Sequence, residues 1–307
     1  MKPARECRQL AILGVGLMGA SIAAAQKRSF PDTIIVGSSI SATDGRIALE
    51  KGYIDRFTQN NKEAVQGADR VIIASPPSSI ISILKEISEM VPGVPVTDIS
   101  SVKTPVYMGF KKDLRSCFPD YTSSHPMAGR EESGAQGARA NLFDGRSTFL
   151  VPFAKTDTSP EEGWEHFWLG IGCRGTFTLD PTEHDRILSL ISHLPHIVSY
   201  AILELLNGAE DKSDLPHFNW EDQKGGALTD MTRISHSHSG LWGEILAANK
   251  KPLIDDLSQL IKILDSWKKQ LSSDGVKDIT QKIESVQHHH QSLKKRERKE
   301  KKDSNAH

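Results

Sequence analysis

One histidine of the chain is placed as a catalytic base would be. His125 is followed by Pro126 and lies within Ser124–Gly129, a segment made mostly of small residues. Because proline fixes its own backbone angle and small neighbours leave space around a ring, this segment can hold one imidazole in a cleft. Histidine has an ordinary pKa close to neutral, which suits it to accept a proton. We predict that His125 is a general base, the alternative being a turn histidine without a role.

A glycine-rich turn near the N-terminus predicts dinucleotide binding. The apolar residues 9–13 run directly into Gly-Val-Gly-Leu-Met-Gly, and the alanine-rich residues 20–25 follow. In a strand, turn and helix of this kind the first glycine permits the turn, the second leaves room for a pyrophosphate and the third lets helix and strand pack. The amides at the helix start then hold the phosphates. The alternative is a purely structural turn. We expect the cofactor to contact Gly14, Gly16, Leu17, Met18 and Gly19.

The residues after the second predicted strand favour NADP over NAD. That strand covers residues 33–36, and an NAD enzyme usually has an acidic residue just after it to hold the ribose hydroxyls. Here Ser38 and Ser39 stand in that place, and the first carboxylate is Asp44. A 2'-phosphate is then not repelled, and the two serine hydroxyls and Arg46 can solvate it. The alternative is that Asp44 or water serves NAD.

Two further apolar runs predict parallel strands that end at one crevice. Residues 70–74 lead to Ser75 and Pro76, and residues 94–99 lead to Ser101. Loops at the carboxyl ends of parallel strands line the ligand crevice of a doubly wound sheet. We therefore expect Ser75 and Pro76 to contact the cofactor and Ser101 to face the nicotinamide. The alternative role for Ser101 is to cap the helix that follows it.

A later strand is expected to bring the histidine to the same edge of this sheet. Residues 120–124 form that strand, and residues 147–151 form the last strand of the sheet. Ser101 and His125 then converge from different strands. This convergence favours a hydride-transfer site over a passive nucleotide-binding module.

The second half of the chain is predicted to be helical. We place the dinucleotide-binding domain at residues 1–153, a helical substrate and dimerisation domain at 154–290, and a charged, disordered tail at 291–307. Apolar residues recur with helical spacing over 252–270 and again over 276–286. Apolar faces of such helices commonly form a dimer interface, although packing within the subunit would give the same pattern.

Two histidines and one arginine of this half are candidate substrate contacts. His193 and His196 share one face of a long helix, and Pro195 between them bends that helix at a cost of about 3 kcal/mol. The pair lacks further ligands at suitable spacing, so we expect no metal; a core role is the alternative for His193. Arg233 is suited to bind a carboxylate, the alternative being a surface ion pair with Asp230.

Composition restricts the partners and the compartment. The 307 residues carry a net charge of -1, which argues against a nucleic-acid-binding body. The cysteines, Cys7, Cys117 and Cys173, form no closely spaced pair, which indicates neither a disulfide framework nor a zinc site. We also find no apolar run of the ~18 residues that a membrane span needs. A cytoplasmic protein with a small-molecule partner, and no nucleic acid or membrane partner, is predicted.

Taken together, these motifs resemble the prephenate/arogenate dehydrogenases of tyrosine biosynthesis, over roughly residues 8–270. The residues that carry the resemblance are Gly14–Gly19, Ser101-Val102-Lys103, His125–Gly129, Glu183-His184-Asp185, Ser192–His196 and Thr232-Arg233-Ile234 leading to Leu241-Trp242. The resemblance implies an α/β fold, with an N-terminal Rossmann-type doubly wound sheet, an all-helical C-terminal domain and a homodimer.

The resemblance also implies a reaction and roles for the site residues. His125 would remove the proton of the ring C4 hydroxyl, with Ser101 as its hydrogen-bonding neighbour. C4 would then release hydride to the nicotinamide of NAD(P), and the ring carboxylate would leave as CO2 because the ring becomes aromatic. The residues expected at the substrate are Arg233 at the ring carboxylate, His196 and His193 near the side chain, and Glu131 as a gating or substrate-contacting acid.

Several readings stay open at this point. Prephenate is favoured over arogenate, because family members that have the second histidine, here His196, often use the keto acid. A related β-hydroxyacid dehydrogenase is a second enzyme hypothesis, but it would need a lysine base in the second domain, for which we find no convincing candidate. A regulator that binds NADP without turnover, and binds a partner through its basic tail, is a third hypothesis.

Overall fold

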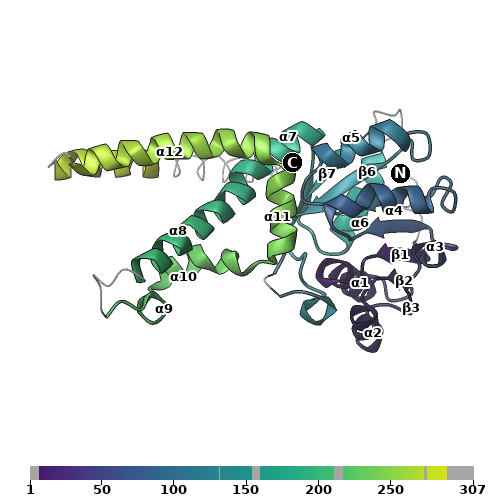
Figure 1. Ribbon diagram of the computed structural model, residues 1–307. Coiled ribbons are helices and arrows are strands. Elements are labelled where there is room, and N and C mark those ends of the chain that lie inside the picture. The colour runs from purple at the N-terminus through teal and green to yellow at the C-terminus, as the bar shows by residue number, and fades with distance from the viewer. Residues whose placement is uncertain (1–6, 131, 154–159, 211–216, 273–274, 289–307) are drawn as a thin grey trace, which may run out of the picture. The chain divides into compact units, whose positions relative to one another are not determined.

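The computed structural model describes residues 7–130, 132–153, 160–210, 217–272 and 275–288 (Figure 1). Its first feature is a five-stranded parallel sheet. Strand order 3-2-1-4-5 is that of a dinucleotide-binding doubly wound sheet, with the switch of direction beside the first strand. The strands, in spatial order, are β3 (Arg56–Thr58), β2 (Ile34–Ser38), β1 (Gln9–Leu13), β4 (Arg70–Ile73) and β5 (Val96–Asp98).

Both faces of this sheet are covered by helices. In β1, Leu10 and Ile12 belong to one apolar core, whereas Ala11 and Leu13 belong to a second core on the opposite face. Successive side chains of a strand point to opposite faces, so this apolar run must be covered twice. Figure 1 shows the two layers. The first core contains residues of α1 (Leu17–Ser29) and α2 (Ala42–Glu50), and the second those of α3 (Asn61–Ala64), α4 (Ile80–Ile87) and α5 (Thr104–Asp113).

The strand that carries His125 corrects one of our predictions. β6 (Thr122–Pro126) and β7 (Ser147–Pro152) pair antiparallel, and β8 (Gly175–Thr178) pairs parallel with β7. These strands form a separate three-stranded sheet and are not the last strands of the parallel one. The tip of β5 and β6 are nevertheless neighbours, because Thr97 Oγ1 donates a hydrogen bond to Ser124 Oγ at 2.9 Å.

Aromatic side chains hold the second sheet against the first core. α6 (Pro160–Gly170) carries Trp164 and Trp168, which are 2% and 0% exposed. Trp168 packs edge to face on Phe143, at 5.7 Å between ring centroids, and its indole nitrogen donates to Ser124 Oγ at 3.0 Å. β6 is therefore fixed from two sides at the residue before His125.

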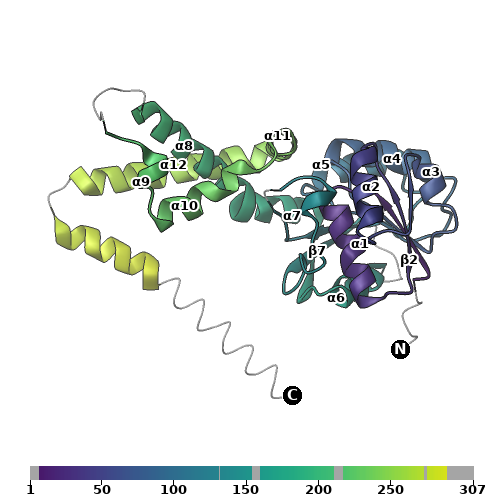
Figure 2. The same ribbon diagram turned by 90° about the horizontal axis from the view of Figure 1, so that it is seen from below.

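The remaining elements of the described chain are helical. Asp180 caps the first helix by accepting hydrogen bonds from the amides of Thr182 and Glu183. In both views α10 lies along α8 (Figures 1 and 2). The elements are α7 (Pro181–Leu188), the π-helical turn η3 (Ser189–His193), α8 (Leu194–Glu210), α9 (Trp220–Gln223), α10 (Gly226–Arg233), η4 (Ile234–His236), α11 (Ser239–Ala248) and α12 (Lys250–Ser272).

The chain divides into two compact units, Met1–Leu253 and Ile254–His307. The first unit contains every element up to α11. In the second unit, α12 continues to Ser272 and residues 276–288 are also helical. The domain boundary between residues 153 and 154 stays a prediction, because residues 154–159 lie outside the described residues. The predicted tail at 291–307 also lies outside them.

One helix corrects our statement about apolar runs. The continuous helix Pro181–Ala209 contains an 18-residue stretch with a mean hydropathy of 1.3, which is long and apolar enough for a membrane span. Length and hydropathy alone do not distinguish such a span from the core helix of a globular domain. This helix also carries His184, Asp185 and His193, which are buried within the protein.

Candidate functional site

The glycine turn has the geometry that a bound pyrophosphate requires. Gly14 has a φ of +107°, and a Cβ there would lie 2.5 Å from the carbonyl oxygen of Ala74. A Cβ on Gly19 would lie 1.9 Å from the Gly14 oxygen, whereas one on Gly16 would have nothing within 4 Å. The first and third glycines are thus required by the protein's own packing. Gly16 alone opens toward free space, as the predicted phosphate position should.

The segment after His125 is attached to the two helices that follow the glycine turn and β2. The amide of Ala135 donates to Asp44 Oδ1 at 2.7 Å, and the amide of Arg139 donates to Ser21 Oγ at 3.1 Å. The short 3-10 turn η2 (Ala135–Gly137) lies between these two bonds. These bonds keep the loop that begins at His125 beside the nucleotide-binding helices.

The structure separates the two serines at the end of β2. Ser38 is 1% exposed, and its hydroxyl donates to Asn61 Oδ1 at 2.7 Å; its contact with a cofactor phosphate stays a prediction. Ser39 is half-buried, and Arg46 is exposed on α2. Asp44, our alternative ribose ligand, already binds the amide of Ala135.

The loop after β4 also lies where we predict cofactor contacts. Ser75 Oγ donates to the carbonyl oxygen of Leu13 at 3.2 Å, at the start of the glycine turn. Pro76 precedes the 3-10 turn η1 (Pro77–Ser79), which contacts α11 of the helical half. Leu17 and Met18 are half-buried at the start of α1. The roles of these four residues toward a cofactor remain predictions.

His125 is the first member of a chain of hydrogen bonds. Its Nδ1 lies 2.9 Å from Nε2 of His184, and Nδ1 of His184 lies 2.9 Å from Oδ1 of Asp185. His184 is fully buried. Burial, followed by the neighbouring His184 and the charge of Lys103, lowers the pKa of His125 well below its ordinary value. His125 is therefore neutral at physiological pH and can accept a proton.

A buried ion pair lies beneath His125. Lys103 and Asp98 are both 0% exposed, with 3.4 Å between Nζ and Oδ1. Lys103 also donates to Ser123 Oγ at 2.6 Å and to the carbonyl oxygen of Ser124 at 2.7 Å, while the hydroxyl of Tyr121 donates to Asp98 at 2.7 Å. The backbone immediately before His125 is therefore held by a charged group.

The two histidines of the helical half have different surroundings. His193 is fully buried and Nδ1 lies 2.9 Å from Nδ2 of Asn249, which also donates to the carbonyl oxygen of Asp185 at 2.7 Å. Nε2 of His193 is buried and has no hydrogen-bond partner among the described residues. His196 is half-buried and stacks on Trp242, with an interplanar angle of 22°. Burial lowers the pKa of His193 to about 4.

Three predicted site residues remain outside this network. Ser101 is half-buried, and among the described side chains the hydrogen-bond partner of His125 is His184 and not Ser101. Arg233 is exposed at the C-terminal end of α10. Glu131 lies outside the described residues.

The sequence analysis assigns no site role to His184, Asp185, Lys103 or Asn249. The first three belong to the motifs that carry the resemblance, but the sequence indicates no role for them. An acidic residue directly after a histidine was the available signal, since a carboxylate commonly orients an imidazole. Asn249 has no local signal, because its partners Asp185 and His193 are 64 and 56 positions away. Asp98 lies only five positions before Lys103, but Ser123 and Ser124, which Lys103 also contacts, are 20 and 21 positions away.

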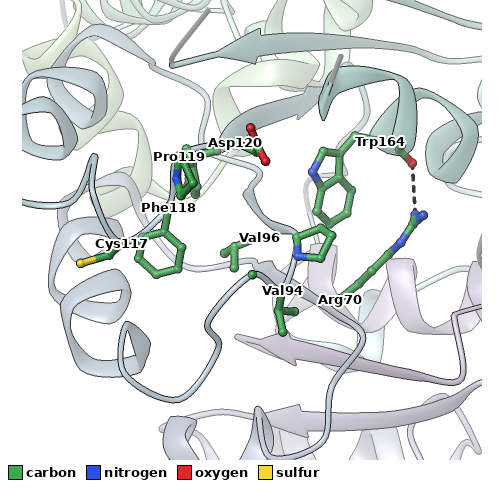
Figure 3. A pocket seen from close by; sticks show the side chains of 12 residues that line it. Arg70, Val94, Val96, Cys117, Phe118, Pro119, Asp120 and Trp164 are labelled. Atoms are coloured by element: carbon green, nitrogen blue, oxygen red, sulfur yellow. Dashed lines mark hydrogen bonds between the residues drawn. The ribbon is translucent and has the colours of Figure 1, made fainter. Parts of the chain in front are cut away.

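A pocket of about 290 Å³ lies elsewhere in the first unit (Figure 3). It is lined by Phe118, Val96 and Trp164, and Arg70 donates to the carbonyl oxygen of Gly163 at its side, at 3.1 Å. Arg70 and Val96 begin β4 and β5. The pocket therefore lies at the amino ends of these strands, whereas the glycine turn follows the carboxyl end of β1.

Comparison with known proteins now identifies the family. Residues 22–176 match the family model described as prephenate dehydrogenase, nucleotide-binding domain, and residues 180–285 match that described as prephenate dehydrogenase, dimerization domain. The chain is 30% identical to prephenate dehydrogenase of Bacillus subtilis (strain 168) over 272 residues, which cover 87% of this chain and 71% of that relative.

Two further relatives agree with this assignment. Cyclohexadienyl dehydrogenase of Zymomonas mobilis is 30% identical over 271 residues, which cover 87% of this chain and 89% of the relative. The crystal structure of prephenate dehydrogenase from A. aeolicus, in complex with hydroxyphenyl propionate and NAD+, has a TM-score of 0.81 and 26% identity, covering 93% of this chain and 98% of that one. On these matches the chain is an oxidoreductase that belongs to the prephenate/arogenate dehydrogenase family.

Proposed function

We propose that this enzyme catalyses the NAD(P)-dependent oxidative decarboxylation of prephenate, or of arogenate, with His125 as the base. The observation that carries the proposal is a neutral imidazole at the end of β6, where the segment that follows is attached to both helices of the predicted nucleotide site, α1 and α2. The products are 4-hydroxyphenylpyruvate from prephenate, or tyrosine from arogenate, together with CO2.

The reaction requires the protein to remove one proton and to hold two rings in contact. His125 accepts the proton of the C4 hydroxyl, so that a carbonyl forms at C4 as its hydrogen leaves with an electron pair. A bound nicotinamide supplies the acceptor for that hydride. The bond from C1 to the ring carboxylate then breaks, CO2 leaves, and its electron pair completes the aromatic ring. The phenolate oxygen takes the proton back from His125.

The substrate end of the proposed site is formed by the helical half. We assign Arg233 to the ring carboxylate, because guanidinium binds carboxylates through two parallel hydrogen bonds. Asn249 uses both amide hydrogens, on Asp185 and on His193 Nδ1, which leaves the hydrogen of His193 on Nε2. That buried donor lacks a partner, and an unmet buried donor costs about 1–3 kcal/mol, so it is suited to a substrate oxygen. We assign His196, stacked on Trp242, and Glu131 to contacts with the substrate side chain.

The proposal includes a preference for prephenate and for NADP. His196 favours the keto acid, as the resemblance implies. The half-buried Ser39 and exposed Arg46 are available to a 2'-phosphate, while Asp44 is bound to the loop after His125. Gly16, with free space beside it, and Gly14, Gly19, Leu17, Met18, Ser75, Pro76 and Ser39 would hold the cofactor, and Ser101 would face its nicotinamide.

We propose that the enzyme is a homodimer. In α12, Ile261 and Leu264 are 52% and 56% exposed in the single chain, and the matching family model is described as a dimerization domain. Residues 1–153 would bind the cofactor and 154–290 would bind substrate and the second subunit. The three cysteines are free thiols, which fits the reducing cytoplasm as its compartment.

One absorbance experiment tests the function. Purified enzyme is mixed with prephenate or arogenate and with NAD+ or NADP+, and the band of the reduced nicotinamide is followed. We expect turnover with prephenate and NADP+, a loss of about 10²–10⁴-fold in kcat for His125→Asn, and kcat/KM that falls only well below pH 6.5. Cofactor binding without turnover in all four mixtures would favour the regulator. A near-normal rate in His125→Asn would exclude His125 as the base.

A further inference from the structure

We propose that His184 and Asp185 are positioning residues that fix the tautomer of His125, leaving Nε2 of His125 as the proton acceptor. This inference rests on the proposed function of His125 as the base. In the proposed reaction neither of these two residues has to contact the substrate or the cofactor.

The chain begins at a carboxylate whose own position is fixed. Oδ1 of Asp185 accepts the amide of Lys103 at 2.8 Å, and Oδ2 accepts the amide of Thr104 at 2.8 Å. Burial raises the pKa of Asp185, but the hydrogen bonds from His184, Lys103 and Thr104 outweigh it and hold the pKa below its usual value. Asp185 is therefore ionised and can only accept hydrogen bonds.

The proton positions then follow one after another. Because Oδ1 of Asp185 can only accept, Nδ1 of His184 must carry a hydrogen. Burial lowers the pKa of His184, so its ring is neutral and Nε2 has a lone pair. That lone pair lies 2.9 Å from Nδ1 of His125, so Nδ1 of His125 must be the donor. A neutral His125 with its hydrogen on Nδ1 has its lone pair on Nε2.

This arrangement matters because the wrong tautomer would not be a base. With the hydrogen on Nε2, His125 would offer a donor to the substrate hydroxyl and could not remove its proton. In serine proteases the buried aspartate fixes the tautomer of the catalytic histidine in the same way, and its replacement by asparagine costs about 10⁴-fold in kcat. Here one more imidazole separates the carboxylate from the base.

The first test reads the tautomer directly and needs no activity. Enzyme labelled with ¹⁵N in histidine is studied by NMR at pH 7.5, and His125→Asn identifies the signals of His125. We expect Nδ1 of His125 to be protonated and Nε2 to be bare. A signal for protonated Nε2 and bare Nδ1 would overturn the proposal whatever the kinetics show.

The second test compares two replacements of His184. Glutamine can accept from His125 through its oxygen and donate to Asp185 through its amide, whereas leucine can do neither. We expect kcat to fall about 10²-fold or more in His184→Leu with little change in the KM for substrate, and to stay within about tenfold of wild type in His184→Gln. His166→Leu is the matched control, because His166 is exposed and, among the described residues, its ring bonds only to the carbonyl oxygen of Glu162.

The pH profile separates positioning from simple loss of packing. The groups that face His125 and His184 are Asp185 on α7, Lys103 before α5, Asp98 on β5 and His193 in η3. In His184→Leu the acid limb of kcat/KM should move to higher pH, because His184 is, after burial, the largest cause of the lowered pKa of His125. An unchanged limb and a wild-type kcat would overturn the proposal.

The activities of His125→Asn and His184→Leu distinguish a failure of this inference from a failure of the proposed function. If His125→Asn retains a near-normal rate, His125 is not the base. If His125→Asn is inactive while His184→Leu has wild-type kcat and pH profile, the base stands and only its positioning by His184 is wrong. Should His184→Leu not fold, the tautomer reading on wild-type enzyme still decides.

Discussion

Replacing Lys103 by methionine should destabilise the protein far more than the same replacement at a shorter ion pair. Lys103 lies 3.4 Å from Asp98 and both are fully buried, whereas Lys85 lies 2.6 Å from Asp113 with side chains 51% and 39% exposed. Distance alone would rank the surface pair higher. Burial reverses the order, because water screens the exposed charges and already solvates them.

The magnitude follows from what each change leaves behind. In Lys103→Met the carboxylate of Asp98 stays buried with the hydroxyl of Tyr121 and the amide of Ser100 as donors but no cation. Breaking a buried pair on one side costs about 3–5 kcal/mol, which corresponds to a fall of roughly 6–20 °C in Tm for a unit of this size. Lys85→Met leaves Asp113 in water, and we expect no measurable change in Tm.

Thermal unfolding followed by circular dichroism checks this prediction. The double variant Lys103→Met with Asp98→Asn should recover part of the lost Tm, because it leaves no unpaired charge. The charge of Lys103 also contributes, after burial and His184, to the lowered pKa of His125. The acid limb of kcat/KM should therefore move to higher pH in Lys103→Met. Equal Tm changes at Lys103 and Lys85 would refute the reasoning.

Three other changes test separate parts of the structure. Gly19→Ala should destabilise the fold by about 1–3 kcal/mol or more, since the new Cβ would meet the Gly14 oxygen. Gly16→Ala should leave the Tm unchanged and raise the Kd for NADP+, measured by calorimetry, tenfold or more. The reverse pattern would contradict the assignment. The free energy of unfolding should fall as pH is lowered from 6.5 to about 4, because over this range His193 takes up a proton in the unfolded chain but stays neutral in the folded protein. His193→Gln should reduce this dependence on pH. Ile261→Glu with Leu264→Glu should give monomers in sedimentation, with Lys262→Glu as the exposed control that stays dimeric.

The parts of the fold that were predicted from sequence are those determined by local chemistry. The apolar run of β1 and the glycine turn into α1 are confirmed at the predicted residues. Each depends on side chains a few positions apart. The separate sheet of β6, β7 and β8 was not predicted, because the antiparallel pairing of Thr122 with Pro152 joins residues whose partners no local pattern specifies.

In the candidate site, too, local sequence patterns do not specify partners that are far away in the chain. His125 stands out through Pro126 and its small neighbours, but its partner His184 is 59 positions away. Lysine is almost never fully buried unless it is paired, so Lys103 reads from sequence as a surface residue until Asp98 is placed beside it. β2 extends to Ser38, two residues beyond the predicted end at Val36, and the Ser38 side chain is buried there.

The turn η3 explains why a proline between two histidines is tolerated and how His193 reaches His184's side of the helix. His193 comes nine positions after His184. In a regular α-helix nine positions are two and a half turns, which would put the two side chains on opposite faces. The π-helical turn Ser189–His193, where the amide of Leu194 bonds to the carbonyl of Ser189, takes up one extra residue. Eight effective positions are about 2.2 turns, so His193 rotates back by roughly 100°. Both rings are fully buried, and Asn249 can then join His193 to the backbone of Asp185. Pro195, which has no amide hydrogen to donate, is the second residue after this turn, so the same irregularity that orients His193 also accommodates the proline.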